Sequence, residues 1–391
     1  MAGLDTPGAV ASGALKLEKT TVKVGFLPLT DCASLVMASV LGLDEKHGIK
    51  IVLSREASWS AIRDQLCSGE LDAAHALYGM VMSVQMGIGA QQHPMAVLMS
   101  LSQNGQAITL SRELVTRGAV DGPSLALLMK REQRQLTFAQ TFPTGNHAMW
   151  LYYWLASVGI DPYRDARVVT VPPSQMVANL KAGHINGFCA GEPWGHRALA
   201  DGVGITATTS QQIWPEHPGK VLAASARFVD AHPNTSRALV AAVLEASRWI
   251  EASQVNKQAM TEAISSPAYV NTSADVIGPR ILGQYHDGLG NQWVDSHCLK
   301  FYDEGAVNFP YLSDAMWFMT QHRRWGLLKE DPDYLAVATG VNRIGLYREA
   351  AELTGTPLPA GVMRASTLID AKVWDGSDPA GYAASFAISR R

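Results

Sequence analysis

Cysteine is scarce in this sequence of 391 residues, which contains only four cysteines, at positions 32, 67, 189 and 298. They lie far apart and form no Cys-x-x-Cys pair, so neither a zinc ribbon nor a redox dithiol is expected. A disulfide framework is also not expected in a chain of this size. Long apolar runs are missing as well: the longest run noted, Ala238–Leu244, has seven residues and leads into Glu245. A membrane-spanning helix needs about 18 or more, so no membrane contact is predicted.

An excess of charge of either sign is also absent. Charged residues make up 17% of the chain, and 32 Lys and Arg stand against 35 Asp and Glu. No basic field is available for a nucleic-acid backbone, so direct nucleic-acid binding is not expected. In contrast, 47% of the residues are hydrophobic and 8% are aromatic. That composition excludes intrinsic disorder, and the length suits two domains of about 100–200 residues each.

The first twenty residues lack the pattern of a secretory signal. Asp5 comes early, and no apolar stretch of about 7–15 residues follows a basic start. We therefore expect a cytoplasmic protein, with a shortened secreted chain as the alternative.

Two segments have the alternating pattern of strands and helices that is typical of parallel sheets. The first predicts strands at 21–27, 49–54 and 71–75, with helices at 33–43 and 59–67. The second predicts strands at 136–141, 167–171 and 185–190, with helices at 147–158 and, capped by Ser174, up to 181. Helical periodicity follows from 236 to about 325, and the Ala-, Gly-, Ser- and Pro-rich tail after Pro357 is expected to be peripheral. The predicted fold is α/β, with two α/β lobes, a ligand cleft between them and a helical C-terminal region.

Motifs of catalysis are missing from the sequence. It contains no Gly-x-Ser-x-Gly elbow, Walker A loop or His-Glu-x-x-His helix, and Gly87-Ile88-Gly89 lacks the third glycine of a dinucleotide loop. His184 and His196 flank Cys189 at a spacing that offers no short metal-binding pair. A nucleophilic Cys–His pair stays open, without a local pattern to support it. We therefore predict no catalytic residues, no metal and no cofactor.

Polar and aromatic residues gather instead where loops meet predicted strand ends. The segments concerned are Trp59, Asn104-Gly105-Gln106, Asn146-His147, Glu192-Pro193-Trp194 and 214–220. Each has an ordinary structural interpretation. Tryptophans such as Trp59 are usually core residues, His147 can belong to the first turn of its helix, and a lysine such as Lys220 is usually solvated.

Taken together, several of these stretches resemble the nitrate/bicarbonate-binding protein family. The resemblance covers residues from about 22 to about 325 and rests on 25–38 (GFLPLTDCASLVMA), 53–77, 104–111 (NGQAITLS), 152–162, 168–194 and 213–223 (IWPEHPGKVLA). The family includes NrtA and CmpA, the solute-binding proteins of ABC importers, and the cytoplasmic sensor NasS. The resemblance implies a type II periplasmic-binding-protein fold, with two crossover strands and the ligand between the lobes. Its implied lobes are 22–108 plus 222–391, which includes the C-terminal helices, and 109–221.

The resemblance also implies a ligand site. The nitrate-binding branch uses a Trp, a Gln, a His and a Lys, which fall on Trp59, Gln106, His147 and Lys220. These residues suit a planar monoanion that only accepts hydrogen bonds, because the lysine supplies charge and the others supply donors. A helix beginning near His147 would add its N-terminal N–H groups. The bicarbonate branch has an acidic residue at the position of Lys220, so the lysine favours nitrate or nitrite.

Three functions follow as hypotheses. The leading one is a NasS-type cytoplasmic nitrate/nitrite sensor that holds a NasT-type RNA-binding antiterminator when it is free of ligand. The alternative is the substrate-binding protein of a nitrate ABC importer. The third is an enzyme of thiamine-pyrimidine synthesis with the same fold, which the four dispersed cysteines disfavour because that branch needs a cysteine-rich motif.

Overall fold

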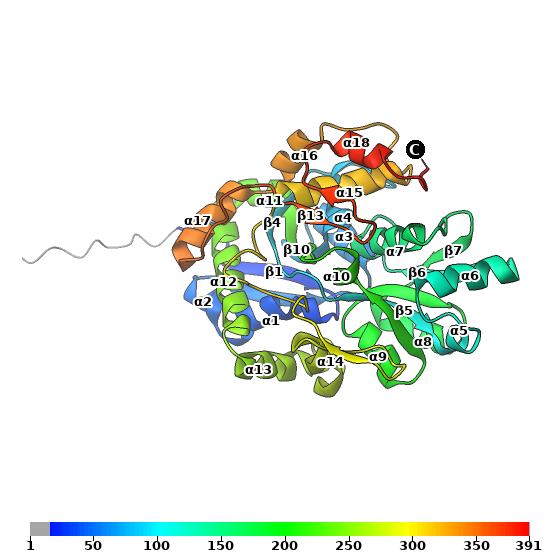
Figure 1. The fold of residues 1–391 in the computed structure, drawn as a ribbon. Coiled ribbons are helices and arrows are strands. Elements are labelled where there is room, and N and C mark those ends of the chain that lie inside the picture. Colours follow the sequence, from blue (N-terminus) through cyan, green and yellow to red (C-terminus); the bar gives the residue numbers. More distant parts are fainter. Residues whose placement is uncertain (1–15, 391) are drawn as a thin grey trace, which may run out of the picture.

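The computed structural model describes residues 16–390 and contains two five-stranded sheets with helices on their faces (Figure 1). The first sheet has the order β2-β1-β3-β10-β4. Its strands are β1 (Thr21–Phe26), β2 (Lys50–Arg55), β3 (Ala73–Leu77), β4 (Met95–Ser100) and β10 (Lys220–Ser225). β1 pairs in parallel with β2 and β3, whereas β10 runs antiparallel to β3 and β4.

The helices between these strands follow the expected β-α-β order. They are the 3-10 turn η1 (Thr30–Cys32), α1 (Ala33–Val40), α2 (Leu43–Lys46), α3 (Trp59–Ser68) and α4 (Tyr78–Gln85). Ser58 begins α3 because its hydroxyl accepts a hydrogen bond from the Ala61 N–H, and Gly69 ends it in the left-handed conformation. The chain then reaches the second sheet directly from β4.

The second sheet has the order β7-β6-β8-β5-β9. Its strands are β5 (Gln106–Ser111), β6 (Leu136–Gln140), β7 (Ala166–Thr170), β8 (Gly187–Gly191) and β9 (Gly204–Thr209). The associated helices are α5 (Arg112–Thr116), α6 (Gly122–Glu132), α7 (Asn146–Ser157), η2 (Pro173–Gln175), α8 (Met176–Lys181), α9 (Trp194–Ala200) and α10 (Ser210–Ile213). Ser174 lies inside η2, so its predicted role as an N-cap is wrong.

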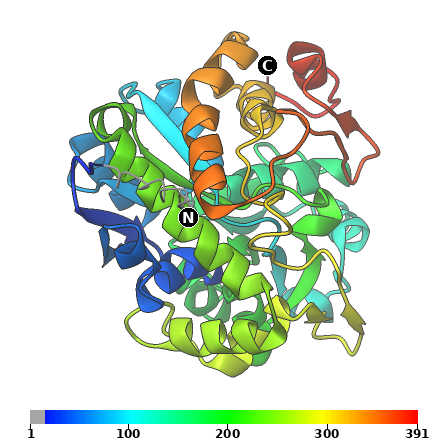
Figure 2. The same cartoon turned by 90° about the vertical axis from the view of Figure 1, so that its left-hand side faces the viewer.

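The chain crosses between the sheets twice, from β4 to β5 and from α10 to β10. It then continues mostly as helices: α11 (Ala226–Ala231), α12 (Pro233–Glu251), α13 (Gln254–Ser265), α14 (Ala274–Ile281), α15 (Leu312–Arg324), α16 (Tyr334–Val341), α17 (Ile344–Thr354) and α18 (Pro379–Ala384). Four short strands form two hairpins, β11 (Gln284–His286) with β12 (Gln292–Val294) and β13 (Ser366–Thr367) with β14 (Val373–Trp374). The long helix α12 contacts both α1 and α17 (Figure 2). The two-sheet α/β fold with a helical C-terminal region is confirmed.

The tail after Pro357 is not peripheral, contrary to the expectation from its composition. Trp374 is 1% exposed and donates from Nε1 to the Ser313 carbonyl at 3.0 Å. Tyr382 and Phe386 are also buried in the same core as α7 and α15. The small residues of the tail therefore separate large aromatic anchors that fix it to the body.

No helix among residues 16–390 is both long enough and apolar enough to cross a bilayer.

Candidate functional site

The predicted site residues meet where corresponding edges of the two sheets face each other. In each sheet this edge holds the carboxyl ends of parallel strands, the usual place for ligands in α/β proteins. Lys220, the first residue of β10, pairs with Leu77, the last residue of β3. Gln106, the first residue of β5, pairs in the same way with Gly191, the last residue of β8. The antiparallel strands therefore bring their first residues to the edge at which the parallel strands end.

Trp59 lies at the start of α3 and is fully buried. Its ring centroid lies 5.4 Å from that of His75, and Lys220 Nζ lies 5.8 Å from the centre of the Trp59 ring. Within the described residues its indole Nε1 has no hydrogen-bond partner. A buried N–H donor without an acceptor is costly, so this atom is available to a ligand.

His147 is the second residue of α7, whose N-terminus is buried. Asn146 fixes this end by accepting from the Gly79 N–H at 3.1 Å and donating to the Gly219 carbonyl at 2.7 Å. The hydroxyl of Thr141 contacts His147 Nδ1, and no atom of residues 16–390 pairs with Nε2. Burial, and then the charge of Lys220, lowers the pKa of His147 well below its usual value. The ring is therefore neutral near pH 7, and a proton on Nε2 would point to the site as a donor.

Gln106 is buried, and both atoms of its side-chain amide lack partners in the described part of the chain. Its backbone N–H donates to Ser210 Oγ at 3.1 Å, which fixes the start of β5. A Cβ atom on the opposite residue, Gly191, would lie 3.5 Å from Lys220 Nζ and 3.7 Å from Asp31 Oδ2. Because Gln106 pairs with Gly191, β5 begins beside the residue that the Lys220 ammonium approaches.

Lys220 is buried, but it is not a free cation. Its Nζ atom lies 2.7 Å from Asp31 Oδ2, and the other oxygen, Oδ1, lies 2.8 Å from His75 Nε2. Burial alone would raise the pKa of Asp31, but the charge of Lys220 and the hydrogen bonds from His75 and Lys220 outweigh it and hold the pKa below its usual value. Asp31 is therefore an anion that is already present in the site.

Sequence reasoning missed Asp31 and His75. Asp31 follows β1 in a turn-prone segment, so its position at a strand end was a usable signal. His75 lies inside β3 with its neighbours buried on both sides, and nothing in its local sequence distinguishes it from a core residue.

The structure brings the other three predicted residues to the neighbourhood of Lys220. Trp59, His147 and Gln106 present unpaired polar groups near the ammonium, and Thr30 adds a buried hydroxyl without a partner among residues 16–390. Leaving such groups unpaired costs about 1–3 kcal/mol each. Because donors predominate around a lysine, the arrangement suits a small anion that would satisfy several of them at once.

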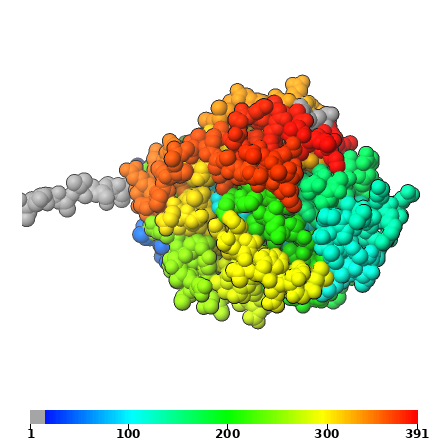
Figure 3. Space-filling model, in the orientation of Figure 1, coloured from blue at the N-terminus to red at the C-terminus, as the bar shows by residue number. Residues whose placement is uncertain are grey.

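Hydrogen bonds beside the site join the facing edges of the first and second sheets. The Thr30 N–H donates to the Glu192 carbonyl at 2.8 Å, and Trp194 Nε1 donates to the Pro28 carbonyl at 3.1 Å. On the face in Figure 3, the green segment that includes residues around 210–220 contacts the yellow and red C-terminal segments. The structure therefore holds the two sheets in a closed arrangement with the site residues buried.

Cysteines and a histidine pair elsewhere among residues 16–390 are further candidates for catalysis or metal binding. Burial raises the pKa of the Cys32 and Cys189 thiols, which disfavours their nucleophilic thiolate forms. His196 Nε2 lies 3.1 Å from His286 Nε2, but no cluster of three or more metal-ligating side chains occurs among residues 16–390.

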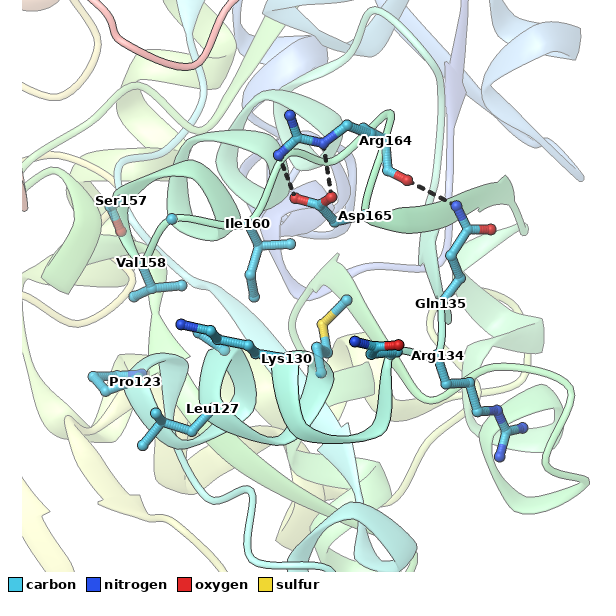
Figure 4. Close-up of a pocket in the computed structure, with 14 residues that line it drawn as sticks. Pro123, Leu127, Lys130, Arg134, Gln135, Ser157, Val158, Ile160, Arg164 and Asp165 are labelled. Carbon is cyan, nitrogen blue, oxygen red and sulfur yellow. Dashed lines mark hydrogen bonds and ion pairs between the residues drawn. The ribbon is translucent and has the colours of Figure 1, made fainter.

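A cavity of about 880 Å³ lies elsewhere, between α6 and the end of α7 (Figure 4). Its lining includes Leu127, Lys130, Ile160 and Arg164, and it contains none of the four predicted residues. Most of its polar side chains are exposed, and Arg164 is already paired with Asp165. We therefore do not assign anion binding to this cavity, although it is large.

Comparisons with known proteins agree with the fold described above. The model of the NMT1-like family matches residues 15–265. The chain is 35% identical over 385 residues to the nitrate/nitrite binding protein NrtA of Synechocystis sp., covering 95% of this chain and 86% of NrtA. It is 31% identical over 410 residues to the bicarbonate-binding protein CmpA of Synechococcus elongatus, covering 97% and 89%.

A third relative is longer than this chain. The nitrate import ATP-binding protein NrtC of Synechocystis sp. is 36% identical over 388 residues, which are 98% of this chain but 57% of NrtC. The crystal structure of the periplasmic nitrate-binding protein NrtA from Synechocystis superposes with a TM-score of 0.90 at 34% identity, covering 95% of this chain and all of that one.

Proposed function

Because the chain belongs to the NMT1-like family, we propose that it is a non-catalytic binding protein for a small monoanion, nitrate or nitrite, held between the two sheets. One observation carries the proposal. Trp59, Gln106 and His147 place unpaired polar groups around Lys220 in a buried site. Relatives with similar chains are named as nitrate/nitrite and bicarbonate binding proteins.

The chemistry of the site supports an oxyanion. Nitrate and nitrite only accept hydrogen bonds, and the indole, amide and imidazole groups can donate to them. The first N–H groups of α7 have no carbonyl partner within the helix and add to the positive potential beside His147. Hydrogen bonds that involve a charged partner contribute about 1.5–3 kcal/mol each, so a few of them give useful affinity even for an ion of four atoms.

Lys220 supports nitrate or nitrite over bicarbonate. The family resemblance implies an acidic side chain at this position in the bicarbonate branch. An acidic group can accept the hydroxyl proton of bicarbonate, whereas an ammonium only donates.

Delivery of the anion to an ABC importer is the role that the comparisons favour. NrtA and CmpA are named as binding proteins, and NrtC is named as an import ATP-binding protein. The partner would then be the membrane-embedded part of an importer. The sensor role, with a cytoplasmic location and a NasT-type partner, has no support from these relatives and stays a prediction from the sequence.

Isothermal titration with nitrate, nitrite and bicarbonate tests the proposal. We expect binding of nitrate or nitrite with a Kd of about micromolar or below and weaker binding of bicarbonate. Lys130→Ala, a change in the α6 cavity, serves as a control that leaves the Kd unchanged. No heat from either nitrogen anion, or tighter binding of bicarbonate, would refute the proposed ligand.

A second experiment separates the two roles. Gel filtration of the protein with a NasT-type antiterminator, with and without nitrate, would show a nitrate-sensitive complex for the sensor. Binding to importer subunits in detergent or nanodiscs, promoted by nitrate, would support delivery to an importer.

A further inference from the structure

The proposed site already contains an anion of the protein itself. Asp31 contacts Lys220 Nζ through Oδ2 and His75 Nε2 through Oδ1, and the side chains of all three residues are at most 1% exposed. The three residues come from η1, β10 and β3, so the fold assembles the contact from distant segments. Asp31 was outside the set of predicted ligand residues.

The charges in this group balance without a ligand. Lys220 contributes one positive charge and Asp31 one negative charge. Burial lowers the pKa of His75 and of His147, so both rings are neutral near pH 7. His217, which also acts on His147, has its pKa lowered to about 3 by burial. An arriving monoanion therefore leaves the site with one net negative charge, and a dianion leaves it with two.

An anion bound at the Lys220 ammonium would also lie close to the Asp31 carboxylate. The position of a Cβ on Gly191 lies 3.5 Å from the ammonium and 3.7 Å from the carboxylate, so both groups face the same point. Repulsion between like charges at such separations is strong in a buried site and scales with the charge of the ligand. A second charge on the ligand therefore roughly doubles the repulsion from Asp31 while Lys220 still offers one cation.

We propose that Asp31 is a specificity-determining residue that restricts the site to anions of single charge by neutralising Lys220 in advance. The proposal rests on the anion-binding function above and goes beyond it, because it assigns the charge selectivity to one carboxylate. Without Asp31, Lys220 would have no counter-ion within the protein, so a bound anion would supply it; monoanions would then bind more strongly and dianions would be tolerated.

A purely structural role for Asp31 makes a different prediction. If the carboxylate only holds Lys220 in place, its loss would weaken every anion to a similar degree. If it sets the charge, its loss would strengthen the binding of anions and change their ranking. The ratio of two dissociation constants separates these roles, whereas stability alone does not.

The test uses Asp31→Asn, which keeps the size and one acceptor oxygen and removes the charge. Nitrate is titrated by calorimetry into the wild type and the variant. Selenite is titrated at mildly acidic pH, where it carries one charge, and at alkaline pH, where it carries two. We expect nitrate to bind the variant at least about tenfold more tightly, since one buried charge shifts affinity by that much or more. The preference for singly charged selenite should fall by a similar factor.

The control is Asp44→Asn, since Asp44 is also a buried carboxylate and accepts from the Ile51 N–H at 2.8 Å, away from the site. It should leave the ranking of anions unchanged. An Asp31→Asn protein that folds but binds nitrate equally or more weakly, with the selenite preference intact, would overturn the proposal.

Titration of the wild-type protein tests the proposal without requiring the variant to fold. If it binds doubly charged selenite as tightly as the singly charged form, Asp31 does not restrict charge. If it fails to bind nitrate or nitrite at all, the proposed function fails first, so the two failures are distinguishable.

Discussion

Lys220 Nζ lies 2.7 Å from Asp31 Oδ2, and both side chains are at most 1% exposed. The pair joins residues 189 positions apart and lies at the meeting edges of the two sheets. Removing one member of such a pair strands a buried charge, which costs more than the pair itself contributes. Lys220 therefore stabilises the folded protein by pairing with Asp31, and it also supplies the positive charge of the site.

Lys220→Ala is expected to abolish nitrate binding and also to destabilise the protein. The free energy of unfolding should fall by about 3–5 kcal/mol, because Asp31 is left without its cation. The double variant Asp31→Asn/Lys220→Met should recover part of this loss and still fail to bind. Urea unfolding and calorimetry measure the two effects. A double variant with the wild-type Kd would show that Lys220 is not needed.

Trp59→Phe is expected to weaken nitrate binding about tenfold without unfolding the protein. Phenylalanine keeps the ring beside His75 but removes the indole N–H, and one hydrogen bond contributes about 1–1.5 kcal/mol. Trp293→Phe, in the half-buried hairpin strand β12, is the matched control and should leave the Kd unchanged. If Trp59→Phe and Trp293→Phe bind nitrate with equal affinity, the Trp59 N–H does not contact the ligand.

Much of the fold could be predicted because local patterns agree with it. β1, α3, β6 and α7 begin within one residue of their expected starts, since alternation, capping residues and glycines mark these positions. The lobe boundaries inferred from the resemblance stay a prediction. The site residues Trp59, Gln106, His147 and Lys220 were inferred from the family resemblance, and their places at the ends of elements are compatible with one shared edge.

The pairing of Lys220 could not be predicted in the same way. It depends on which strands are neighbours, and β10 enters the first sheet between β3 and β4 after a long excursion. His75 reaches Asp31 only because β3 lies beside both β1 and β10. The tail was misjudged for a related reason. Its small residues dominate the composition, whereas a few aromatic residues decide its packing.

Acid should destabilise the protein through its buried histidines, and His322 on α15 offers a clear test. Burial, opposed by the hydrogen bond to the Thr144 carbonyl, lowers the pKa of His322 to about 4. The unfolded chain binds this proton near the usual pKa of 6.5, so the contribution is complete above that pH and is lost as the pH falls toward 4. The loss amounts to about 1.4 kcal/mol per pH unit, or about 3 kcal/mol in total.

His322→Gln should flatten this part of the stability curve, because glutamine can still donate to the Thr144 carbonyl but does not titrate in this range. Urea unfolding between pH 7 and pH 4 measures the slope. His184→Gln, at an exposed position, should leave the slope as it is. An unchanged slope in the His322 variant would show that this ring does not control the acid sensitivity.

The C-terminal tail should stabilise the helix that carries His147. Tyr153 on α7 donates to Asp370 Oδ1 at 2.8 Å, and its ring lies 5.5 Å from that of Phe386, so the tail packs directly on α7. Trp374 anchors the tail through its buried ring and its bond to the Ser313 carbonyl.

Trp374→Ala should therefore lower the free energy of unfolding by about 3–5 kcal/mol, the usual cost of removing a buried aromatic ring. Val373→Ala, next to it but 61% exposed, should change stability by less than about 0.5 kcal/mol. Urea unfolding of both variants provides the comparison. If the two changes cost the same, the tail does not contribute to the folded core. If only Trp374→Ala is costly, the tail is part of the core that fixes α7, and nitrate should protect the variant less from thermal unfolding than the wild type.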